Sequence, residues 1–166
     1  MKMRETSKRP SGTPMDAALR YLGYRARTVR ELERYLDEQQ FGEYEISQVI
    51  ERLKELGLAD DAKFAADFIE SRLRTKPVSR RHLQEQLYAH ELPREVIEEA
   101  LSVVTDEMEQ ANATAVAEKY WRQFMALPDA KRAERVLQRL QGRGFSYGVS
   151  LQAVTMLSDA AEGDGV

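Results

Sequence analysis

The chain has 166 residues, of which 32% are charged and 42% hydrophobic, with a formal net charge of −3. This balance is typical of a soluble protein, and no apolar run approaches the ~18 residues that a membrane span requires. The absence of cysteine excludes disulfides, thiolate catalysis and cysteine-based zinc sites. We therefore expect a cytoplasmic protein that does not insert into membranes.

The N-terminal segment, "MKMRETSKRPSGTP", is basic but lacks the apolar centre of a secretory signal. We expect residues 1–14 to form a disordered basic tail. Beyond it, apolar residues recur every three or four positions among Leu, Ala, Glu, Arg and Gln, which is the pattern of amphipathic helices. No segment alternates with period two for long, so the sequence predicts an all-α fold without a sheet.

Three segments align with one another without a gap, at a spacing of roughly 50 residues. They are residues 28–50, 79–101 and 132–154. The matching apolar positions are Leu32, Leu83 and Val136; Leu36, Leu87 and Leu140; and Phe41, Leu92 and Phe145. Such a period indicates one helical unit copied three times.

Each unit begins with an apolar helix, followed by a capping residue, a second helix, a short turn and a third helix. Thr28 and Glu31 have the spacing of a capping box, Ser79 holds the place of Thr28 in the second unit, and Asp129 is expected to cap slightly earlier in the third. Pro93 fits the first turn of a helix.

We therefore expect three tandem three-helix repeats that form an elongated, curved array. The expected repeats are residues 15–58, 59–105 and 106–158, followed by a frayed acidic tail at 159–166. Since a three-helix unit of about 50 residues has a thin core, we expect neighbouring units to bury outward apolar positions against each other.

The glycine-rich stretch Gly142–Gly148 raises the alternative of a phosphate-binding loop. A P-loop requires a preceding strand and a Gly-Lys-Ser/Thr ending, and neither is present. In the repeat, Phe145 is the apolar residue of the turn. Gly142 and Gly144 allow the chain to leave the helix with positive φ. Ser146 can cap the next helix. The stretch is therefore interpreted as a turn between helices.

Several of these segments resemble the RecX regulators. "GLADDAKFAADFIESRLR" (57–74) resembles their Leu-x-Asp-Asp-x-x-Phe-Ala signature, residues 79–101 resemble their second repeat, and "RLQGRGFSYGV" (139–149) resembles the Arg-Gly-Phe-Ser-Tyr ending of their third. The resemblance covers roughly residues 16–157, with Ser150 standing where the other repeats have isoleucine.

The resemblance implies a non-catalytic regulator that binds the groove of the RecA recombinase filament. Such a protein modulates, and most often inhibits, recombination, ATPase and co-protease activities, and it belongs to DNA repair and the SOS response. Some members of the family also bind DNA. We expect a monomer.

Residue patterns typical of catalysis or metal binding are weak. Asp60 and Asp61 could bind a metal, but their place before an apolar helix favours a cap. His82 and His90 lie about two helical turns apart, too far for the usual chelate spacing. Trp121 could stack on bases, but its spacing favours the core. We expect no enzyme activity, cofactor or metal.

Two basic segments are the candidate partner-binding residues. The first lies in an acid-free stretch before an expected helix start, and the second forms one stripe of a helix. The candidates are Arg72, Arg74, Lys76, Arg80 and Arg81, and Arg132, Arg135, Arg139 and Arg143. They could contact DNA phosphates or an acidic protein surface, or they could form a solvated face with local ion pairs.

The charges alone leave two further functions open. The chain could be a helical-repeat module that binds single- or double-stranded DNA directly, because three-helix units can act as helix-turn-helix readers. It could also be a helical adaptor for another charged partner.

Overall fold

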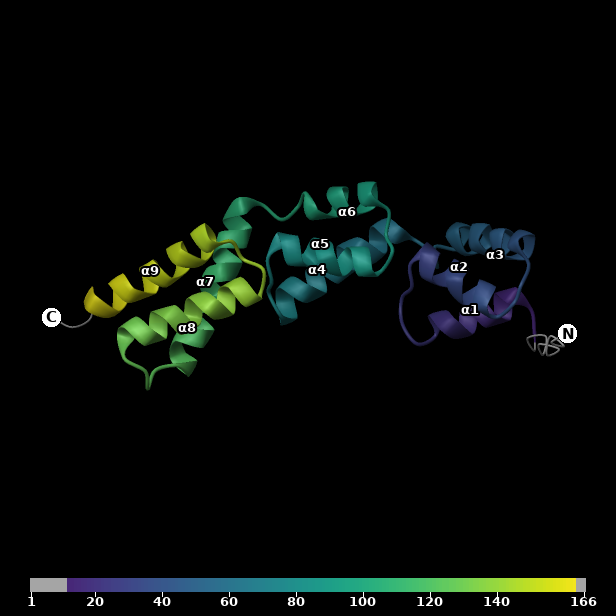
Figure 1. Cartoon of the computed structure of the whole chain (residues 1–166). Helices are drawn as coiled ribbons and strands as arrows, with labels where there is room; N and C mark the ends of the chain where they lie inside the picture. Colours follow the sequence, from purple (N-terminus) through teal and green to yellow (C-terminus); the bar gives the residue numbers. More distant parts are fainter. Residues whose placement is uncertain (1–11, 164–166) are drawn as a thin grey trace, which may run out of the picture.

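The computed structural model describes residues 12–163, and within this range it contains nine helices and no strand. The first three are α1 (Pro14–Leu22), α2 (Val29–Glu38) and α3 (Glu43–Glu55). The next three are α4 (Asp61–Thr75), α5 (Arg80–Ala89) and α6 (Arg94–Leu101). The last three are α7 (Asp106–Gln123), α8 (Asp129–Gly142) and α9 (Tyr147–Gly163). The predicted all-α fold of three tandem three-helix repeats is confirmed (Figure 1).

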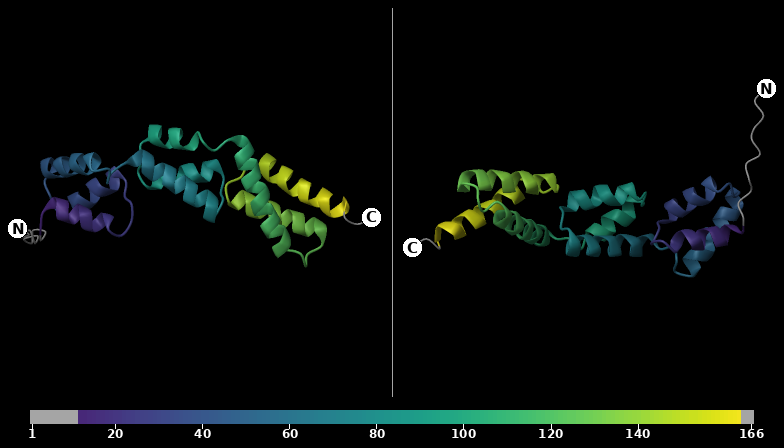
Figure 2. Two further views of the ribbon diagram at one scale, coloured as in Figure 1. Left: turned by 180° about the vertical axis from the view of Figure 1, so that it is seen from behind. Right: turned by 90° about the horizontal axis from the view of Figure 1, so that it is seen from below.

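The three repeats, here called the first, second and third modules, follow one another in a row. The views in Figures 1 and 2 agree that the first module lies at one end and the third at the other, so the molecule is elongated. Curvature of the array stays a prediction. None of the described helices combines the length and the apolar character needed to cross a membrane.

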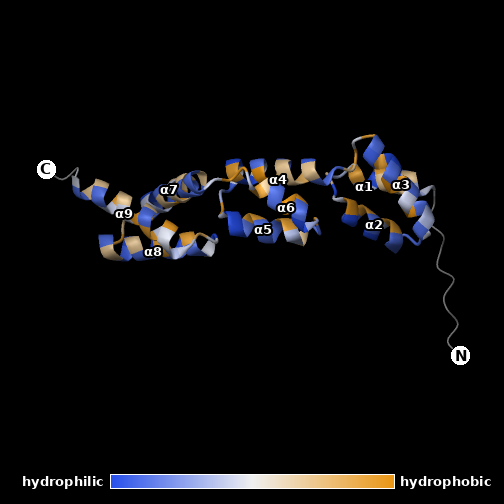
Figure 3. Cartoon of the chain, turned by 90° about the horizontal axis from the view of Figure 1, so that it is seen from above, coloured by the Kyte–Doolittle hydropathy of each residue, from blue (hydrophilic) through white to orange (hydrophobic). Residues whose placement is uncertain are grey.

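Each module encloses its own apolar core. The three clusters of buried residues centre on Leu32 and Leu36, on Leu83 and Leu87, and on Val136 and Leu140, and the helical residues of each cluster come from one module only. Figure 3 shows hydrophobic and hydrophilic residues mixed along every helix. The expectation that neighbouring modules bury apolar positions against each other is therefore wrong.

The caps predicted for the second helices of the first two modules are confirmed. The Thr28 hydroxyl accepts a hydrogen bond from the Glu31 amide, and the Glu31 carboxylate accepts one from the Thr28 amide, which completes the capping box. The Ser79 hydroxyl accepts from the His82 amide at 3.0 Å. Each hydroxyl satisfies one of the helix-start amides that lack a partner within the helix.

Other predicted ends differ from the structure. The helix α8 has Pro128 at its N-cap and no side-chain cap, so the predicted cap by Asp129 is wrong. Pro93 is the N-cap of α6 and lies just before its first turn. The expected N-terminal tail lies outside the described residues up to residue 11, but Pro14 already begins α1. The helix α9 continues through Gly163, so the first part of the tail expected to fray is helical.

All three second helices end in the same backbone conformation. Gln40, Glu91 and Gly144 occupy equivalent positions of the repeat and have positive φ values of 67°, 58° and 88°. After Gly144, the Phe145 amide returns to the Leu140 carbonyl at 3.2 Å, which is the hydrogen bond of a left-handed helix stop. The interpretation of the glycine-rich stretch as a turn is confirmed, but the positive φ predicted for Gly142 is wrong, because Gly142 is the last residue of α8.

The first and second modules meet through hydrogen bonds to the start of α2. The Thr28 hydroxyl donates to the His90 carbonyl at 2.8 Å, and the Val29 amide donates to the Asp61 carboxylate at 2.9 Å. Val29 is the first residue of α2, so its amide has no acceptor within the helix. Thus α4 of the second module completes the cap of α2.

The second joint repeats this arrangement one module later. The Ser79 amide donates to the Arg143 carbonyl at 3.2 Å, and the Arg80 amide donates to the Glu109 carboxylate at 3.0 Å. Ser79 and Arg80 are the repeat equivalents of Thr28 and Val29. The two joints therefore use one device: an acid from the next module binds the first amide of the preceding second helix.

Gly144 should be the least replaceable of the positive-φ residues. A methyl group there would overlap the Ser79 hydroxyl and lie 3.0 Å from the His82 Cβ, whereas at Gly57, also with positive φ, it would meet open space. We expect Gly57→Ala to lower the free energy of unfolding by about 1 kcal/mol and Gly144→Ala by roughly 3 kcal/mol. Urea unfolding followed by circular dichroism measures both, and equal losses would contradict the close approach at the joint.

Asp61 should stabilise the fold through the hydrogen bond that it accepts and not through its negative charge. Asp61→Ala leaves the Val29 amide without an acceptor and should cost about 1 kcal/mol, whereas Asp61→Asn keeps an acceptor oxygen. We therefore expect the Asn variant to stay close to the native stability. Urea unfolding, together with hydrogen exchange of the Val29 amide, compares the Ala and Asn variants. An Asn variant as unstable as the Ala variant would show that the negative charge is required.

Candidate partner-binding surface

The nine predicted cations do not form one surface, because several belong to the framework of the protein. The Arg80 guanidinium donates to the Val104 carbonyl at 3.0 Å and forms ion pairs with Asp106 and Glu109 of α7. Its hydrogen bond to Asp106 raises the pKa of Arg80. Arg80 therefore holds the second and third modules together.

Arg132 and Arg143 are also engaged by the protein itself. Arg132 donates to the Trp121 carbonyl at 2.7 Å, and its guanidinium lies 4.2 Å from the centroid of the indole ring. Trp121 is only 8% exposed and belongs to the core of the third module, so its predicted core role is confirmed. Arg143 donates to the Pro77 carbonyl at 3.0 Å and to the Tyr120 hydroxyl at 3.1 Å.

Two further cations lie over aromatic rings of their own module. The Arg72 guanidinium is 5.3 Å from the ring centroid of Phe68, and that of Arg139 is 5.8 Å from the ring centroid of Tyr120. Such contacts orient the guanidinium groups but leave their outer edges able to bind an anion.

The remaining candidates are exposed. Arg81 forms an ion pair with Glu85 one turn along α5. Arg74, Lys76 and Arg135 have no ion-pair partner among the described residues. The alternative of a solvated face with local pairs thus fits Arg81, while the other three keep their charge available for a partner.

The fold brings together cations from both basic segments at the second joint. Lys76 at the end of α4, Lys119 on α7 and Arg143 at the end of α8 line a pocket of about 380 Å³, here called the basic pocket, which has no acidic residue in its lining. The hydrogen bond from Arg143 to Pro77 joins the two segments there. Three cations around one concavity are suited to binding a phosphate or carboxylate group.

Lys119 was not among the residues singled out from the sequence. It is a single lysine next to Glu118, outside both basic runs, and only the packing of α7 beside the loop after α4 places it near Lys76. A helical-wheel argument cannot find it, because its partners lie on other helices.

The acidic pair has two separate structural roles. Asp60 accepts a hydrogen bond from the Lys63 amide at 3.0 Å, which confirms its predicted capping of α4. Asp61 reaches the first module, and burial raises the pKa of its carboxyl despite the hydrogen bond from the Val29 amide. Within residues 12–163 no group of three or more His, Asp or Glu residues is placed to hold a metal ion.

The histidine His90 also belongs to the first joint. It is the C-cap of α5, and its Nδ1 lies 2.8 Å from a carboxylate oxygen of Glu31. Burial raises the pKa of the Glu31 carboxyl, but hydrogen bonds from Arg25, His90 and the Thr28 amide outweigh it and hold the pKa below the usual value. Glu31 is therefore a buried carboxylate whose negative charge the joint stabilises.

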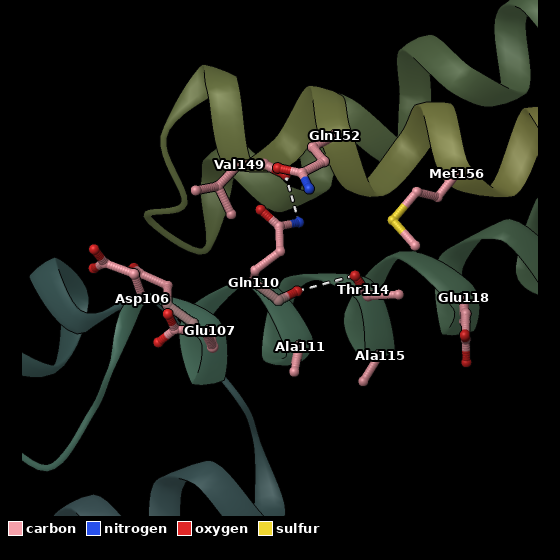
Figure 4. Close-up of a pocket in the computed structure, with 11 residues that line it drawn as sticks. Asp106, Glu107, Gln110, Ala111, Thr114, Ala115, Glu118, Val149, Gln152 and Met156 are labelled. Carbon is pink, nitrogen blue, oxygen red and sulfur yellow. Dashed lines mark hydrogen bonds between the residues drawn. The ribbon is translucent and has the colours of Figure 1, made fainter.

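A groove between α7 and α9 carries the opposite charge to the basic pocket. Its volume is about 860 Å³, and its lining includes Asp106, Glu107, Glu109 and Glu118. Figure 4 shows Gln110 extending from α7 towards α9, where it donates to the Val149 carbonyl at 3.2 Å. Two of its acids, Asp106 and Glu109, are engaged by Arg80.

These features define a class of protein: an all-helical tandem-repeat protein whose modules are joined by polar contacts. The family comparisons give this class a name. Family models described as the first, second and third three-helix domains of RecX match residues 15–53, 60–101 and 106–154. The chain belongs to the RecX family of regulatory proteins.

Relatives and solved structures agree with this assignment. The chain is 35% identical over 137 residues to the regulatory protein RecX of Mycobacterium ulcerans, covering 82% of this chain and 79% of the relative. It is 34% identical to that of Chlorobaculum tepidum, covering 86% and 87%. The crystal structure of RecX from Lactobacillus salivarius superposes with a TM-score of 0.76 at 26% identity, covering 87% of this chain and 94% of that one.

The first joint should weaken in acid through Glu31. Because the pKa of Glu31 is lowered in the folded state, the ionised carboxylate contributes stability above the ordinary glutamate pKa, and this contribution is lost as pH falls through the folded value. The pKa of Asp61 is raised in the folded state, so this carboxyl has the opposite effect: it favours the folded state more as the pH falls. Urea unfolding should therefore be compared between Asp61→Asn and Asp61→Asn/Glu31→Gln as the pH falls from about 6 to 3. We expect the first protein to lose more stability, and parallel pH profiles would contradict this role of Glu31.

Proposed function

We propose that this protein binds along the RecA recombinase filament and restrains its recombination, ATPase and co-protease activities. Its membership of a family of regulatory proteins supports this role. So does the row of three modules, which offers a long surface to a polymer (Figure 1).

The modular row suits contact with successive subunits of a helical filament. Each module contributes a weak contact, and the second and third contacts gain from the high effective concentration created by the first. Because the joints are made of hydrogen bonds and ion pairs, small changes at each joint can fit the row to the filament pitch without opening any apolar core. A row in the filament groove would block entry of duplex DNA or of a repressor.

The basic pocket is the part of the surface that we assign to the filament. Phosphates of the bound DNA or carboxylates of the recombinase are the groups that Lys76, Lys119 and Arg143 would contact. The acid-free lining also favours a second function, direct binding to DNA. In that case affinity should fall steeply with salt, because each phosphate contact releases counterions.

The proposal is tested with purified protein and RecA assembled on single-stranded DNA. ATP hydrolysis and strand exchange should both decrease as the protein is added at up to a few molecules per RecA. Unchanged rates at stoichiometric excess would reject the proposed function. Faster strand exchange would support RecA as the partner but show that the protein activates it.

The role of the basic pocket is tested by reversing its exposed charges. Lys76→Glu with Lys119→Glu should weaken inhibition of RecA at least tenfold, since both side chains are exposed and their loss leaves the fold intact. The control is Arg52→Glu with Lys54→Glu on α3, which changes the net charge equally at the far end of the row. Inhibition curves for the native protein and both variants give the comparison, and equal losses would show that only overall charge matters.

The same two variants separate the two functions. Their binding to single-stranded DNA without RecA is measured by fluorescence anisotropy at several salt concentrations. If the pocket variant loses DNA binding but still inhibits RecA, the basic pocket is a DNA site and the filament contact lies elsewhere.

A further inference from the structure

The second module carries an apolar groove between its first and third helices, on a surface that none of the assignments above uses. The groove has a volume of about 440 Å³ and lies between α4 and α6. Its walls include Ala66, Ile69 and Leu73 from α4 and Val96 and Ala100 from α6. An open apolar concavity of this size is the usual form of a site for apolar side chains of a partner.

The apolar surface continues beyond α6 towards the third module. Val103, in the segment between α6 and α7, is 63% exposed, and Met108, in the first turn of α7, is 41% exposed, and both line the same groove. A flexible methionine at the edge can adjust to the shape of an incoming side chain. The groove is therefore open to solvent and accessible to another protein.

The rim of the groove carries two unpaired negative charges. Glu70 on α4 and Glu99 on α6 line it, and neither has an ion-pair partner among the described residues. Two other acids on the same two helices, outside the groove, form ion pairs: Asp67 with Lys63, and Glu98 with Arg94. The two unpaired carboxylates thus bracket an apolar floor, and their natural complement is a pair of cations.

The corresponding groove of the third module, between α7 and α9, has a different character. There Gln110 bridges the two helices by its hydrogen bond to Val149, and polar and acidic residues line the groove (Figure 4). No hydrogen bond of this kind joins α4 to α6 in the part of the chain that the structure describes. The apolar, unbridged form is thus a property of the second module and not a general feature of the repeat.

We propose that the groove between α4 and α6 binds a segment of the recombinase protomer that presents an aliphatic side chain flanked by lysine or arginine. The aliphatic side chain would fill the apolar floor, and the flanking cations would pair with Glu70 and Glu99. This inference rests on the proposed function and adds to it a second kind of contact: a protein contact at this groove, beside the anion contact at the basic pocket.

The experiment measures binding of fluorescently labelled protein to RecA assembled on poly(dT) with a non-hydrolysable ATP analogue. Glu70→Lys with Glu99→Lys places like charges opposite the proposed cations and should weaken binding at least tenfold, which corresponds to about 1.4 kcal/mol. Ala66→Gln adds a larger, polar side chain to the apolar lining of the groove at an exposed helix position. It should weaken binding by a similar factor. Circular dichroism and urea unfolding confirm that both variants fold.

The matched control is Asp67→Lys with Glu98→Lys, which makes the same change of charge on the same two helices outside the groove. We expect it to change filament binding less than twofold. Equal loss in the control, native affinity in both groove variants, or a matching loss of binding to poly(dT) alone would each overturn the groove site. The native protein tests the larger claim: if it does not bind the filament, the proposed function fails and this site fails with it.

Discussion

The contact on which the array depends is a hydrogen bond from the first amide of a second helix to a carboxylate of the next module. Val29 donates to Asp61 at the first joint, and Arg80 donates to Glu109 at the second. A helix-start amide has no acceptor within its own helix, so it must find one elsewhere or remain unsatisfied. Here each helix start obtains one acceptor from its own cap and another from the neighbour. Completion of a helix within one module and attachment of the next module are therefore the same event.

The apolar part of each module's stability, unlike the capping of its second helix, comes from within the module. The apolar cores are closed within each module, so the hydrophobic contribution to folding does not depend on the neighbour. The joints are made by hydrogen bonds and ion pairs. In a tandem array with apolar interfaces, by contrast, any bend opens a cavity. A row of closed modules on polar joints is suited to following a polymer whose pitch varies.

The repeat pattern was sufficient to predict the elements of the fold but not the partners of their side chains. Alignment of the three segments predicts the caps at Thr28 and Ser79 and the turn at Phe145, because these depend on residues close in sequence. Asp61 was predicted as part of a local cap, yet it caps a helix of another module. Lys119 was missed for the same reason. Contacts across a joint depend on how modules pack, and no periodicity within one module encodes that packing.

The same limit explains why the basic segments alone do not show which of their charges have partners within the protein. Asp106 and Glu109 of α7 pair with Arg80, so one cation of the first basic segment serves to hold the second and third modules together. Arg132 and Arg143 are engaged in a similar way by Trp121 and Pro77. What distinguishes a binding charge from a structural one is the lack of an internal partner, and that depends on three-dimensional position. By this criterion Lys76 and Lys119 on one surface, and Glu70 and Glu99 on another, are among the charges that have no ion-pair partner within the described residues.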